Sequence, residues 1–356
     1  MRITAIEVEP LDLTLQTALT VAYGSYPVLN YALLKIITDE GLIGLGEASP
    51  DPEVTGETQA IVLQALRQVA PLLLGRDPLE IEFLLSACSA ALAHAPAALA
   101  AVDMALYDLA GQALRVPVYQ LLGGLVRSSI ALYPVIPLDE PSVMAAMSAQ
   151  FVSMGAQTLK VKLGSSPDLD LLRLREIRGA VGDHVNLRLD INQGWRDAAT
   201  ALAVIRHLAG FNIEWIEQPV AAADLEGLAA VAAAVETPIM ADESCHTAAD
   251  ALKIACLGAA DMLNIKLMKC GGLNAAAKLL AVAEAAGLSC ILGSMGESSI
   301  GSAAGLHFVA VHPSIIACEL IGPLFITNDP ATGYQIAMDT FQAQISAVPG
   351  LGVRLK

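Results

Sequence analysis

Hydrophobic and polar residues follow one pattern in the first third of the chain and another pattern in the rest. The first third contains short apolar segments typical of strands and then longer segments typical of helices. The expected strands are residues 3–15, 31–38 and 42–48, and the expected helices are residues 58–74, 79–92 and 97–114. Asp39-Glu40-Gly41 indicates a hairpin between the last two strands, and Pro117 follows the last helix. This pattern predicts an α+β domain.

From about residue 130 the pattern changes to short apolar runs that are separated by helical segments. The expected strands are residues 130–136, 158–163, 186–191, 213–216, 238–241, 262–267, 289–292 and 315–320. The expected helices between them include residues 168–180, 222–234 and 273–286. Regular alternation of strands and helices predicts parallel pairing, and eight such units predict a closed α/β barrel.

These two patterns divide the 356 residues into two expected domains and a tail. We expect the α+β domain over residues 1–125 and the barrel over residues 126–323. Residues 324–356 are too few for another domain, and we expect them to fold back on the N-terminal one. A chain of this length is sufficient for such an arrangement.

Five consecutive strands of the expected barrel end in, or carry near their end, a charged residue. These residues are Lys162, Asp190, Glu217, Asp242 and Lys266, at successive spacings of 28, 27, 25 and 24 residues. The C-terminal ends of barrel strands converge on one face, where the active sites of this fold lie. We therefore expect the five side chains to meet at that face.

The three carboxylates of this set predict a cation site. Asp190, Glu217 and Asp242 would repel one another strongly in a partly dry site. Ligation by oxygen atoms alone suits Mg²⁺ or Mn²⁺. Such a cation can hold a substrate carboxylate and stabilise the enolate that forms when the proton on the α-carbon leaves.

The two lysines of the set predict acid/base chemistry. Lys162 and Lys266 belong to the second and sixth strands, on opposite sides of the barrel. An amine is a base only when it is neutral. Lys160 lies on the same strand face as Lys162, and its charge, together with that of the metal, is expected to lower the lysine pKa.

Each of these short motifs also has a purely structural interpretation. An isolated Lys-x-Lys is usually a solvated strand end, and Glu-Gln-Pro or Asp-Glu-Ser can start a loop or cap a helix. Their order and matched spacing favour the functional interpretation. A structural role is expected for the other candidates, namely Glu243, Lys269, Asp103, Asp108 and the six histidines, with His94, His207 and His307 packed in the core.

Composition excludes several classes of protein. With 55% hydrophobic and 16% charged residues, the chain is too apolar for disorder. Its longest uncharged stretches, residues 84–102 and 300–318, are interrupted by histidine and proline, so we expect buried elements and no membrane span. The first residues lack a signal-peptide core, and the six cysteines lack paired spacing, which favours the cytoplasm. A net charge of −16 disfavours nucleic acid as a partner.

With these motifs in place, the chain resembles the enolase superfamily over nearly its whole length. The resemblance extends from Gly44-Leu45-Gly46-Glu47-Ala48 to Pro349-Gly350-Leu351-Gly352. It implies a (β/α)7β-type barrel, similar to a TIM barrel, under an N-terminal α+β capping domain. It also implies that cap loops near residues 15–30 and 50–57 determine specificity.

The resemblance implies a role for each charged residue at the strand ends. The Mg²⁺ ligands would be Asp190, Glu217 and Asp242, and the two acid/base groups would be Lys162 and Lys266, with Lys160 supporting Lys162. Lysine on strand six, and no histidine in residues 292–297 after strand seven, differ from the mandelate racemase type. The chain is more similar to the muconate-lactonising subgroup, whose members include cycloisomerases, succinylbenzoate synthases, N-acylamino-acid racemases and dipeptide epimerases.

Within the subgroup the chain is most similar to dipeptide epimerases. The similar segments are residues 55–58, 157–163, 187–195, 237–244 and 260–272. Strand eight differs, because dipeptide epimerases typically have Asp-x-Asp there to hold the free ammonium of the substrate. This chain has Glu319-Leu320-Ile321-Gly322-Pro323, which resembles muconate cycloisomerases. Glu319 can still pair with an amine, but Ile321 cannot.

The resemblance also implies a set of residues that contact a small carboxylate substrate. They are Tyr26, Thr55, Asn192, Ser294, Met295, Glu297, Glu319 and Ile321. Residues 13–34 carry no charge, and the cap loop lacks an arginine for a glutamate side chain. The variable part of the substrate is therefore expected to be neutral or apolar.

Three functions remain open at this point, in a chain that we expect to form a homo-oligomer. The first is racemisation or epimerisation of a dipeptide or N-acyl amino acid. The second is cycloisomerisation of a muconate-like diacid, or a reaction of the o-succinylbenzoate synthase type, in which a single lysine suffices. A binding protein without catalysis is the third, and it does not need two opposed lysines.

Overall fold

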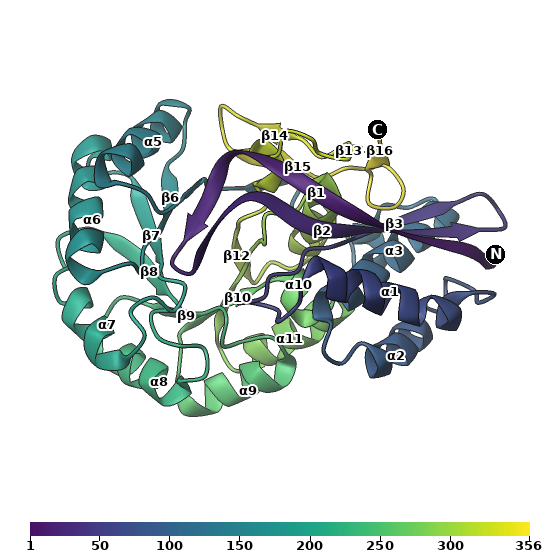
Figure 1. Cartoon of the computed structure of the whole chain (residues 1–356), viewed down its shortest axis with the longest axis horizontal. Helices are drawn as coiled ribbons and strands as arrows, with labels where there is room; N and C mark the ends of the chain where they lie inside the picture. The colour runs from purple at the N-terminus through teal and green to yellow at the C-terminus, as the bar shows by residue number, and fades with distance from the viewer.

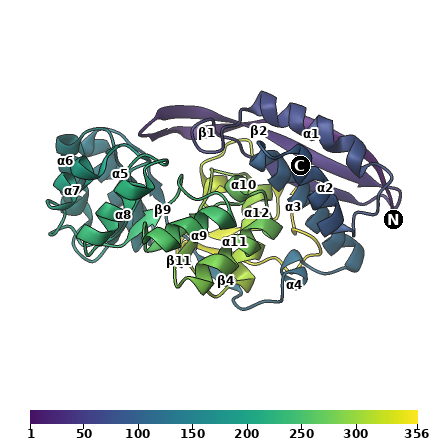
Figure 2. The ribbon, with the colours of Figure 1, turned by 90° about the horizontal axis from the view of Figure 1, so that it is seen from below.

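The computed structural model describes all residues of the chain, 1–356. Figure 1 shows an N-terminal unit of long strands and helices next to a curved sheet that is surrounded by helices. Both termini lie on the side of the N-terminal unit, as the view from below in Figure 2 also shows. The α/β class and the capping arrangement predicted from the sequence are confirmed.

The N-terminal unit is an antiparallel sheet with helices packed on it. The strands are β1 (Ile3–Val21), β2 (Gly24–Thr38) and β3 (Ile43–Ala48), and the helices are α1 (Gln59–Leu73), α2 (Ile81–Ala91), α3 (Pro96–Leu114) and α4 (Val118–Leu121). The three helices predicted for this region agree with α1, α2 and α3 to within two residues at each end.

The second unit is one parallel sheet whose eight strands follow the order of the chain. These strands are β5 (Val135–Ile136), β6 (Thr158–Lys162), β7 (Asn186–Asp190), β8 (Ile213–Glu217), β9 (Ile239–Ala241), β10 (Met262–Ile265), β11 (Ser289–Leu292) and β12 (Ile315–Cys318). The helices of this unit are α5 (Pro141–Ser153), α6 (Pro167–Val181), α7 (Ala198–Ile205), α8 (Leu225–Ala234), α9 (Ala248–Leu257), α10 (Leu267–Cys270), α11 (Leu273–Ala285) and α12 (Ser299–Val311). The predicted alternation of strands and helices is therefore present.

The first barrel strand differs from its prediction. Instead of one strand over residues 130–136, β4 (Ser129–Ala131) pairs with the C-terminal tail, and only β5 joins the barrel sheet. Pro134 lies between them and has no N–H to continue a ladder. A single parallel bridge from Leu132 to Cys318 links the two ends of the curved sheet.

The tail contacts both units. It consists of a 3₁₀ turn η1 (Gly322–Leu324) and the short strands β13 (Ala331–Thr332), β14 (Ile336–Ala337), β15 (Gln342–Gln344) and β16 (Arg354–Leu355). Leu15 of β1 bridges to Ile326, and the Val118 N–H donates to the Gly350 carbonyl at 3.0 Å. The domain limits at residues 125 and 323 stay a prediction.

The segment expected to be a specificity loop near residues 15–30 is instead a hairpin arm. β1 and β2 stay paired up to Val21 and Gly24, with one irregularity between Thr14 and Leu19. The segment is uncharged and rich in threonine, valine and tyrosine, which favour strands. Figure 1 shows the arm extending across the barrel, where the Leu138 N–H donates to the Thr20 carbonyl at 2.8 Å.

Helix α3 is the most buried helix of the N-terminal unit. It meets the length and composition of a membrane-crossing helix, but 72% of its most apolar window is buried inside the molecule, as in a core helix. Strand β3 approaches it closely because Gly44 and Gly46 have no side chain. A Cβ atom on Gly46 would lie 1.9 Å from the Ala101 carbonyl oxygen of α3. One continuous core includes residues of both units.

Most of the buried polar groups that were expected to be structural hold elements together. Asp103 accepts the N–H groups of Leu273 and Asn274 at the start of α11, at 2.7 and 3.1 Å. Asp108 accepts those of Leu45 and Leu351, at 2.9 and 2.8 Å. These carboxylates satisfy backbone donors that would otherwise be buried without a partner.

The expectation for the histidines in apolar stretches holds for one of three. His307 is buried, with Nε2 3.1 Å from the Leu351 carbonyl oxygen. His94 and His207 are exposed, so their predicted core position is wrong. His94 follows the end of α2 and His207 follows the end of α7, where the chain turns to solvent.

Glu47 joins the cap to the barrel. It ends near the start of α12, where it accepts the N–H groups of Ser298 and Gly301 at 2.9 and 3.1 Å. The Ser298 hydroxyl also donates to it. Burial raises the pKa of Glu47 to about 7.

The close approach of β3 and α3 predicts the effect of adding a methyl group. Gly46→Ala should lower the free energy of unfolding by about 1–3 kcal/mol, because the backbone of α3 must move away. Gly179→Ala is the matched control, since Gly179 lies in α6 with nothing within 4 Å of its added Cβ. The control should be neutral or stabilising by up to about 1 kcal/mol. Urea denaturation measures both, and equal effects would contradict the packing argument.

The raised pKa of Glu47 predicts a dependence of stability on pH. An acid whose pKa is higher in the folded than in the unfolded state stabilises the fold at low pH, and this contribution is lost as the pH rises through the folded value. From pH 5 to pH 7.5 the wild type should therefore lose about 1–3 kcal/mol relative to Glu47→Gln, which cannot titrate. Denaturation at the two pH values, with Glu226→Gln on exposed α8 as control, tests this. A stability difference that does not change with pH would refute it.

Candidate active site

Parallel pairing brings the charged strand ends to one level of the barrel. Lys162 of β6 lies opposite Asp190 of β7, and Asp190 lies opposite Glu217 of β8. Asp242 follows β9 directly, and Lys266 lies between β10 and α10. None of the five residues exposes more than 9% of its surface. The spacing argument from the sequence therefore brings all five together.

The three carboxylates form a compact buried cluster. One oxygen atom from each of Asp190, Glu217 and Asp242 lies within 4.8 Å of the other two. Burial raises the pKa of Glu217 well above its ordinary value, and the charge of Asp190 adds to the effect. For Asp190, burial acts in the same direction, but Lys160 and Lys162 outweigh it and the pKa is lowered. Like charges held this close need a cation.

The cluster fits Mg²⁺. Glu217 Oε2 lies 2.9 Å from the Lys160 ammonium but accepts no hydrogen bond, so a buried oxygen atom has lone pairs available. Its other oxygen accepts from the Asn264 amide at 2.9 Å, which fixes the carboxylate. Three carboxylates without nitrogen or sulfur donors match the preference of Mg²⁺, which retains further positions for water or substrate. Asp190, Glu217 and Asp242 would hold the ion.

Lys160 is the counter-ion of the cluster. Its ammonium lies 2.8 Å from Asp190, 2.9 Å from Glu217 and 2.8 Å from Glu319. Burial acts to lower the pKa of Lys160, but the three carboxylates raise it well above its ordinary value. Carboxylates therefore surround the charge of Lys160.

The two candidate acid/base lysines each pair with a different metal-ligand candidate. The Lys162 ammonium donates to Asp190 at 2.7 Å and to the Asn192 side-chain oxygen at 3.0 Å. The Lys266 ammonium donates to Asp242 at 2.6 Å. Burial acts to lower the pKa of Lys266, but Asp242 and the other nearby carboxylates outweigh it, so the net direction is upward. A cation that takes up the carboxylate charge weakens this effect.

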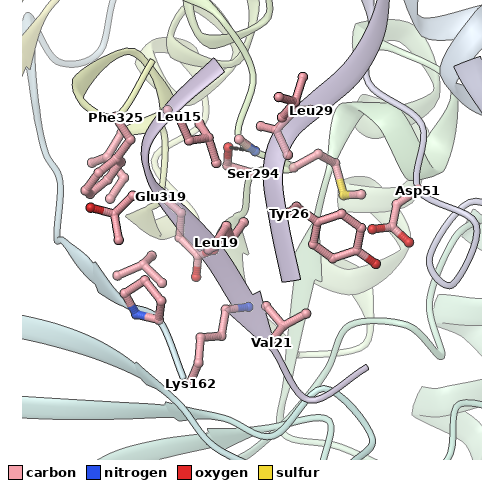
Figure 3. A pocket seen from close by; sticks show the side chains of 18 of the residues that line it. Leu15, Leu19, Val21, Tyr26, Leu29, Asp51, Lys162, Ser294, Glu319 and Phe325 are labelled. Carbon is pink, nitrogen blue, oxygen red and sulfur yellow. Dashed lines mark hydrogen bonds between the residues drawn. The ribbon is translucent and has the colours of Figure 1, made fainter. Parts of the chain in front are cut away.

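A cavity of about 580 Å³ lies between the hairpin arm and these strand ends. Its wall includes Lys162 and Lys266, together with residues of the arm, of the loop at residues 50–59 and of the segment at residues 319–325. In Figure 3, Glu319 and Phe325 lie on one side of the cavity, and Tyr26 and Asp51 lie on the other. The arrangement places two amines beside a cation site in one cavity.

The comparison with known proteins agrees with this geometry. Residues 143–356 match the family model described as enolase C-terminal domain-like, and residues 3–123 match the N-terminal domain of the mandelate racemase / muconate lactonizing enzyme family. The chain belongs to the enolase superfamily. Members of this superfamily use Mg²⁺.

Three relatives illustrate the range of chemistry in the superfamily near this chain. The N-succinyl-L-Arg/Lys racemase of Bacillus cereus is 37% identical over 100% of this chain and 96% of its own length, and its crystal structure has a TM-score of 0.97. The hydrophobic dipeptide epimerase of Enterococcus faecalis is 39% identical over 99% of both chains. A crystal structure of the dipeptide epimerase from that organism, complexed with Mg and L-Leu-L-Tyr, has a TM-score of 0.95. The chloromuconate cycloisomerase of Pseudomonas putida is 32% identical over 99% of this chain and 97% of its own length.

Six of the eight residues predicted to contact substrate line the cavity. They are Tyr26, Asn192, Ser294, Met295, Glu319 and Ile321. Asn192 has a left-handed backbone, with a φ of 43°. Its side-chain amide lies between two residues: it accepts a hydrogen bond from Lys162 and donates one to Glu243. Such positive φ values in residues other than glycine are typical of functional sites.

Thr55 and Glu297 do not line the cavity, so the prediction that they contact substrate is not supported. The Thr55 hydroxyl donates to the Asp51 carbonyl and accepts from the Asp51 N–H, both at 3.1 Å, within its own turn. Glu297 accepts from the Met295 N–H at 3.0 Å and from the Ser294 hydroxyl. Each residue shapes its own loop, and other side chains of both loops line the cavity. In a loop, sequence spacing does not determine which side chains face inward.

Three polar residues beside the site were missed or given no functional role from the sequence. Lys269 donates to Asp242 Oδ1 at 2.5 Å, and Asn264 contacts Glu217. Asp51 lines the cavity. Asn264 shares a strand face with Lys266, and Lys269 lies about one helical turn after Lys266. The periodicity of strand and helix could therefore have identified Asn264 and Lys269 as neighbours of the site. No local signal distinguishes Asp51 from an ordinary loop residue.

The buried carboxylate cluster predicts how the chain responds to loss of one charge. Glu217→Gln should weaken Mg²⁺ binding at least about tenfold, because the amide keeps the shape but loses the charge attraction. Glu226→Gln, on the exposed face of α8, is the matched control and should bind normally. Isothermal titration calorimetry measures both affinities. Wild-type affinity in Glu217→Gln would refute the assignment of the metal site.

Proposed function

We propose that this protein is a Mg²⁺-dependent racemase or epimerase that moves the α-proton of a dipeptide or an N-acyl amino acid. The observation that carries the proposal is the pair of lysines, Lys162 and Lys266, which reach one cavity from strands β6 and β10 beside the carboxylate cluster. Two amines that face opposite sides of a carbon atom can remove a proton from one face and return a proton to the other face.

The residues of the chain divide the work of such a reaction. When bound, Mg²⁺ supplies positive charge that holds the substrate carboxylate and stabilises the negative charge formed as the α-proton leaves. One lysine, in its neutral form, accepts the proton, and the opposite lysine, in its charged form, donates one to the other face. Lys160 balances the charge of Asp190, Glu217 and Glu319, and the hairpin arm limits the access of water.

The relatives support this reaction class. The racemase of B. cereus and the epimerase of E. faecalis are both similar to this chain over its whole length. The wall of the cavity contributed by the hairpin arm includes Leu15, Leu19, Val21 and Leu29 and has no charged side chain. This apolar wall supports a substrate whose variable part is neutral or apolar.

Cycloisomerisation of a muconate-like diacid, or an o-succinylbenzoate synthase-like reaction, is the second candidate. It is favoured by Glu319 and Ile321, which follow strand eight (β12), and by the similarity to the chloromuconate cycloisomerase of P. putida. In that reaction one lysine handles the proton, and the other acts as a cation near the developing negative charge. A binding protein without catalysis has no use for two opposed lysines.

Three further properties belong to the proposal. Mn²⁺ should replace Mg²⁺, because both prefer oxygen ligands. All six cysteines are free thiols, which is consistent with a reducing cytoplasm. A homo-oligomer of the chain, without nucleic acid or membrane partners, is the expected form, since most soluble oligomers are symmetric homo-oligomers.

The two-base mechanism predicts complementary losses in the two lysine variants. Lys162→Ala and Lys266→Ala should each lower net epimerisation by about 10²–10⁴-fold, since each removes one of the two proton-transfer groups. Each variant should still exchange the α-proton of the one stereoisomer that faces its remaining lysine. Proton NMR in D₂O with Mg²⁺, on both stereoisomers of an active compound from a library of dipeptides, acyl amino acids and muconates, measures the exchange.

The controls separate loss of chemistry from loss of the site. Each lysine pairs with a carboxylate of the cluster, so its removal could disturb the metal site. The affinity of both variants for Mg²⁺ is therefore measured and must equal that of the wild type. If no amino-acid derivative exchanges its α-proton in wild type while a muconate is lactonised, the epimerase proposal is wrong and the second candidate stands.

A further inference from the structure

Glu243 is a buried carboxylate beside the site, and it has no part in the proton transfer described above. It exposes 5% of its surface and does not line the cavity, whereas Asn192, which contacts it, does. The Asn192 side-chain amide donates to Glu243 Oε1 at 3.0 Å, and the oxygen of the same amide accepts from the Lys162 ammonium at 3.0 Å. Two successive hydrogen bonds therefore connect Glu243 to one of the two candidate acid/base groups.

The contact with Glu243 determines which way the Asn192 amide points. A side-chain amide has a donor end and an acceptor end. Because Glu243 Oε1 accepts from the NH₂ group, the amide oxygen is left to face Lys162. Without an acceptor at position 243 the amide can turn over and present its NH₂ group to the ammonium, which is also a donor. The other oxygen of Glu243, Oε2, has no hydrogen-bond partner, so the side chain is committed to Asn192.

The backbone at Asn192 is held in place for this contact. Its φ is 43° and that of Gln193 is 67°, in the left-handed region that residues other than glycine rarely adopt. The Asn192 N–H donates to Asp190 Oδ1 at 3.0 Å, and the Gln193 N–H donates to the Gln218 carbonyl at 2.8 Å. The loop thus fixes the position of the amide, and Glu243 fixes its orientation.

Two acceptors determine the free direction on the Lys162 nitrogen. The ammonium donates to Asp190 Oδ2 at 2.7 Å and to the Asn192 oxygen. An ammonium has three N–H groups, and the neutral amine has two N–H groups and a lone pair. With two directions engaged by acceptors, the third is the one that exchanges the α-proton. The Lys162 side chain reaches into the cavity, where that proton lies in the proposed reaction (Figure 3).

Asn192 is the acceptor of Lys162 that lies outside the carboxylate cluster. The other acceptor, Asp190, is a candidate Mg²⁺ ligand, and its Oδ2 also pairs with Lys160 at 2.8 Å. Neither Asn192 nor Glu243 belongs to the cluster. The contact with Asn192 therefore does not compete with the metal for a carboxylate oxygen.

We propose, on the basis of the function proposed above, that Glu243 is a positioning residue that directs Lys162 toward the α-carbon by orienting the Asn192 amide. Lys266 takes no part in these hydrogen bonds and has one acceptor, Asp242 Oδ2 at 2.6 Å. Glu243 therefore serves proton transfer on one face of the substrate and has no effect on the other face.

Variants at position 243 test the inference on the stereoisomer that Lys162 faces, which is the one that still exchanges its α-proton in Lys266→Ala. Glu243→Leu removes the acceptor and should lower kcat for exchange of this stereoisomer at least about tenfold, with KM within about threefold of wild type, because a misdirected base slows proton transfer without weakening substrate binding. Glu243→Gln keeps an acceptor in the same place and should retain kcat within about threefold. Proton NMR in D₂O with saturating Mg²⁺ measures the exchange.

The opposite stereoisomer is the internal control, because Lys266 removes its proton. Its kcat in Glu243→Leu should stay within about threefold of wild type. Glu243 directly follows Asp242, so calorimetric Mg²⁺ affinity and circular dichroism check the metal site and the fold of each variant. If Glu243→Leu does not fold, Glu243→Ala takes its place with the same expected result.

A double variant tests whether Glu243 acts through Asn192. Asn192→Gly removes the amide and suits the left-handed backbone, and it should show the same selective loss. The variant with both Asn192→Gly and Glu243→Leu should lose no more than Asn192→Gly alone, since both changes break one series of contacts. Crystal structures of wild type and Glu243→Leu give a readout without catalysis. The contact between Lys162 Nζ and Asn192 Oδ1 should be present in the first and lost in the second.

The outcomes are distinct. Equal losses for both stereoisomers in Glu243→Leu overturn the inference, because Glu243 then supports the site as a whole. A loss in Glu243→Gln as large as that in Glu243→Leu, additive losses in the double variant, or an unchanged contact of Lys162 with Asn192 in Glu243→Leu also overturns it. Each of these results leaves the proposed function intact. If wild type binds Mg²⁺ but exchanges the α-proton of no compound, the proposed function fails and the inference fails with it.

Discussion

The repulsion among three buried carboxylates is the constraint on which the rest of this structure depends. Asp190, Glu217 and Asp242 lie within 4.8 Å of one another, without access to water, and the raised pKa of Glu217 reports the strain of that arrangement. Lysines surround the cluster, and Lys160 and Lys269 are almost wholly buried. A buried ion pair contributes little net stability unless its geometry and hydrogen bonds are good. Such an arrangement is understandable where the charges serve binding and chemistry.

The fold meets this constraint by distributing the charges over separate strands. Each of the strands β7, β8 and β9 brings one carboxylate to the same level of the barrel, so the three carboxylates come from three different strand ends. The cap then closes the site from above, where Glu47 binds the start of α12 and the arm reaches residues 138 and 325. The loop that joins β11 to α12, next to the contact of Glu47, also places Ser294 and Met295 in the cavity wall. The contacts that hold the cap on the barrel therefore also position this part of the cavity wall.

The sequence predicted the parts of this arrangement that repeat with the period of the fold. The positions of Lys162, Asp190 and Glu217 followed from strand ends alone, since a hydrophobic strand followed by a charge is a local pattern. Pairing between distant residues has no local pattern. The partnership of Lys160 with Glu319, 159 residues away, could not be predicted for this reason, and neither could the inward direction of Asp51. The hairpin arm was expected to be a loop because the family resemblance implied a specificity loop near residues 15–30, although the strand-forming residues there also favour a paired ribbon.

The engagement of Glu319 separates the chemistry of the site from its selectivity. The strand ends of β6 to β10 carry the groups proposed for metal binding and proton transfer. A substitution of one of these groups changes the net charge of the buried cluster. Ile321 lines the cavity and has no charge, so a substitution at this position changes the cavity wall without removing a charge from the cluster. Glu319 lines the same cavity but is held by Lys160 and Tyr133, so a substitution at position 319 also changes the charge around Lys160.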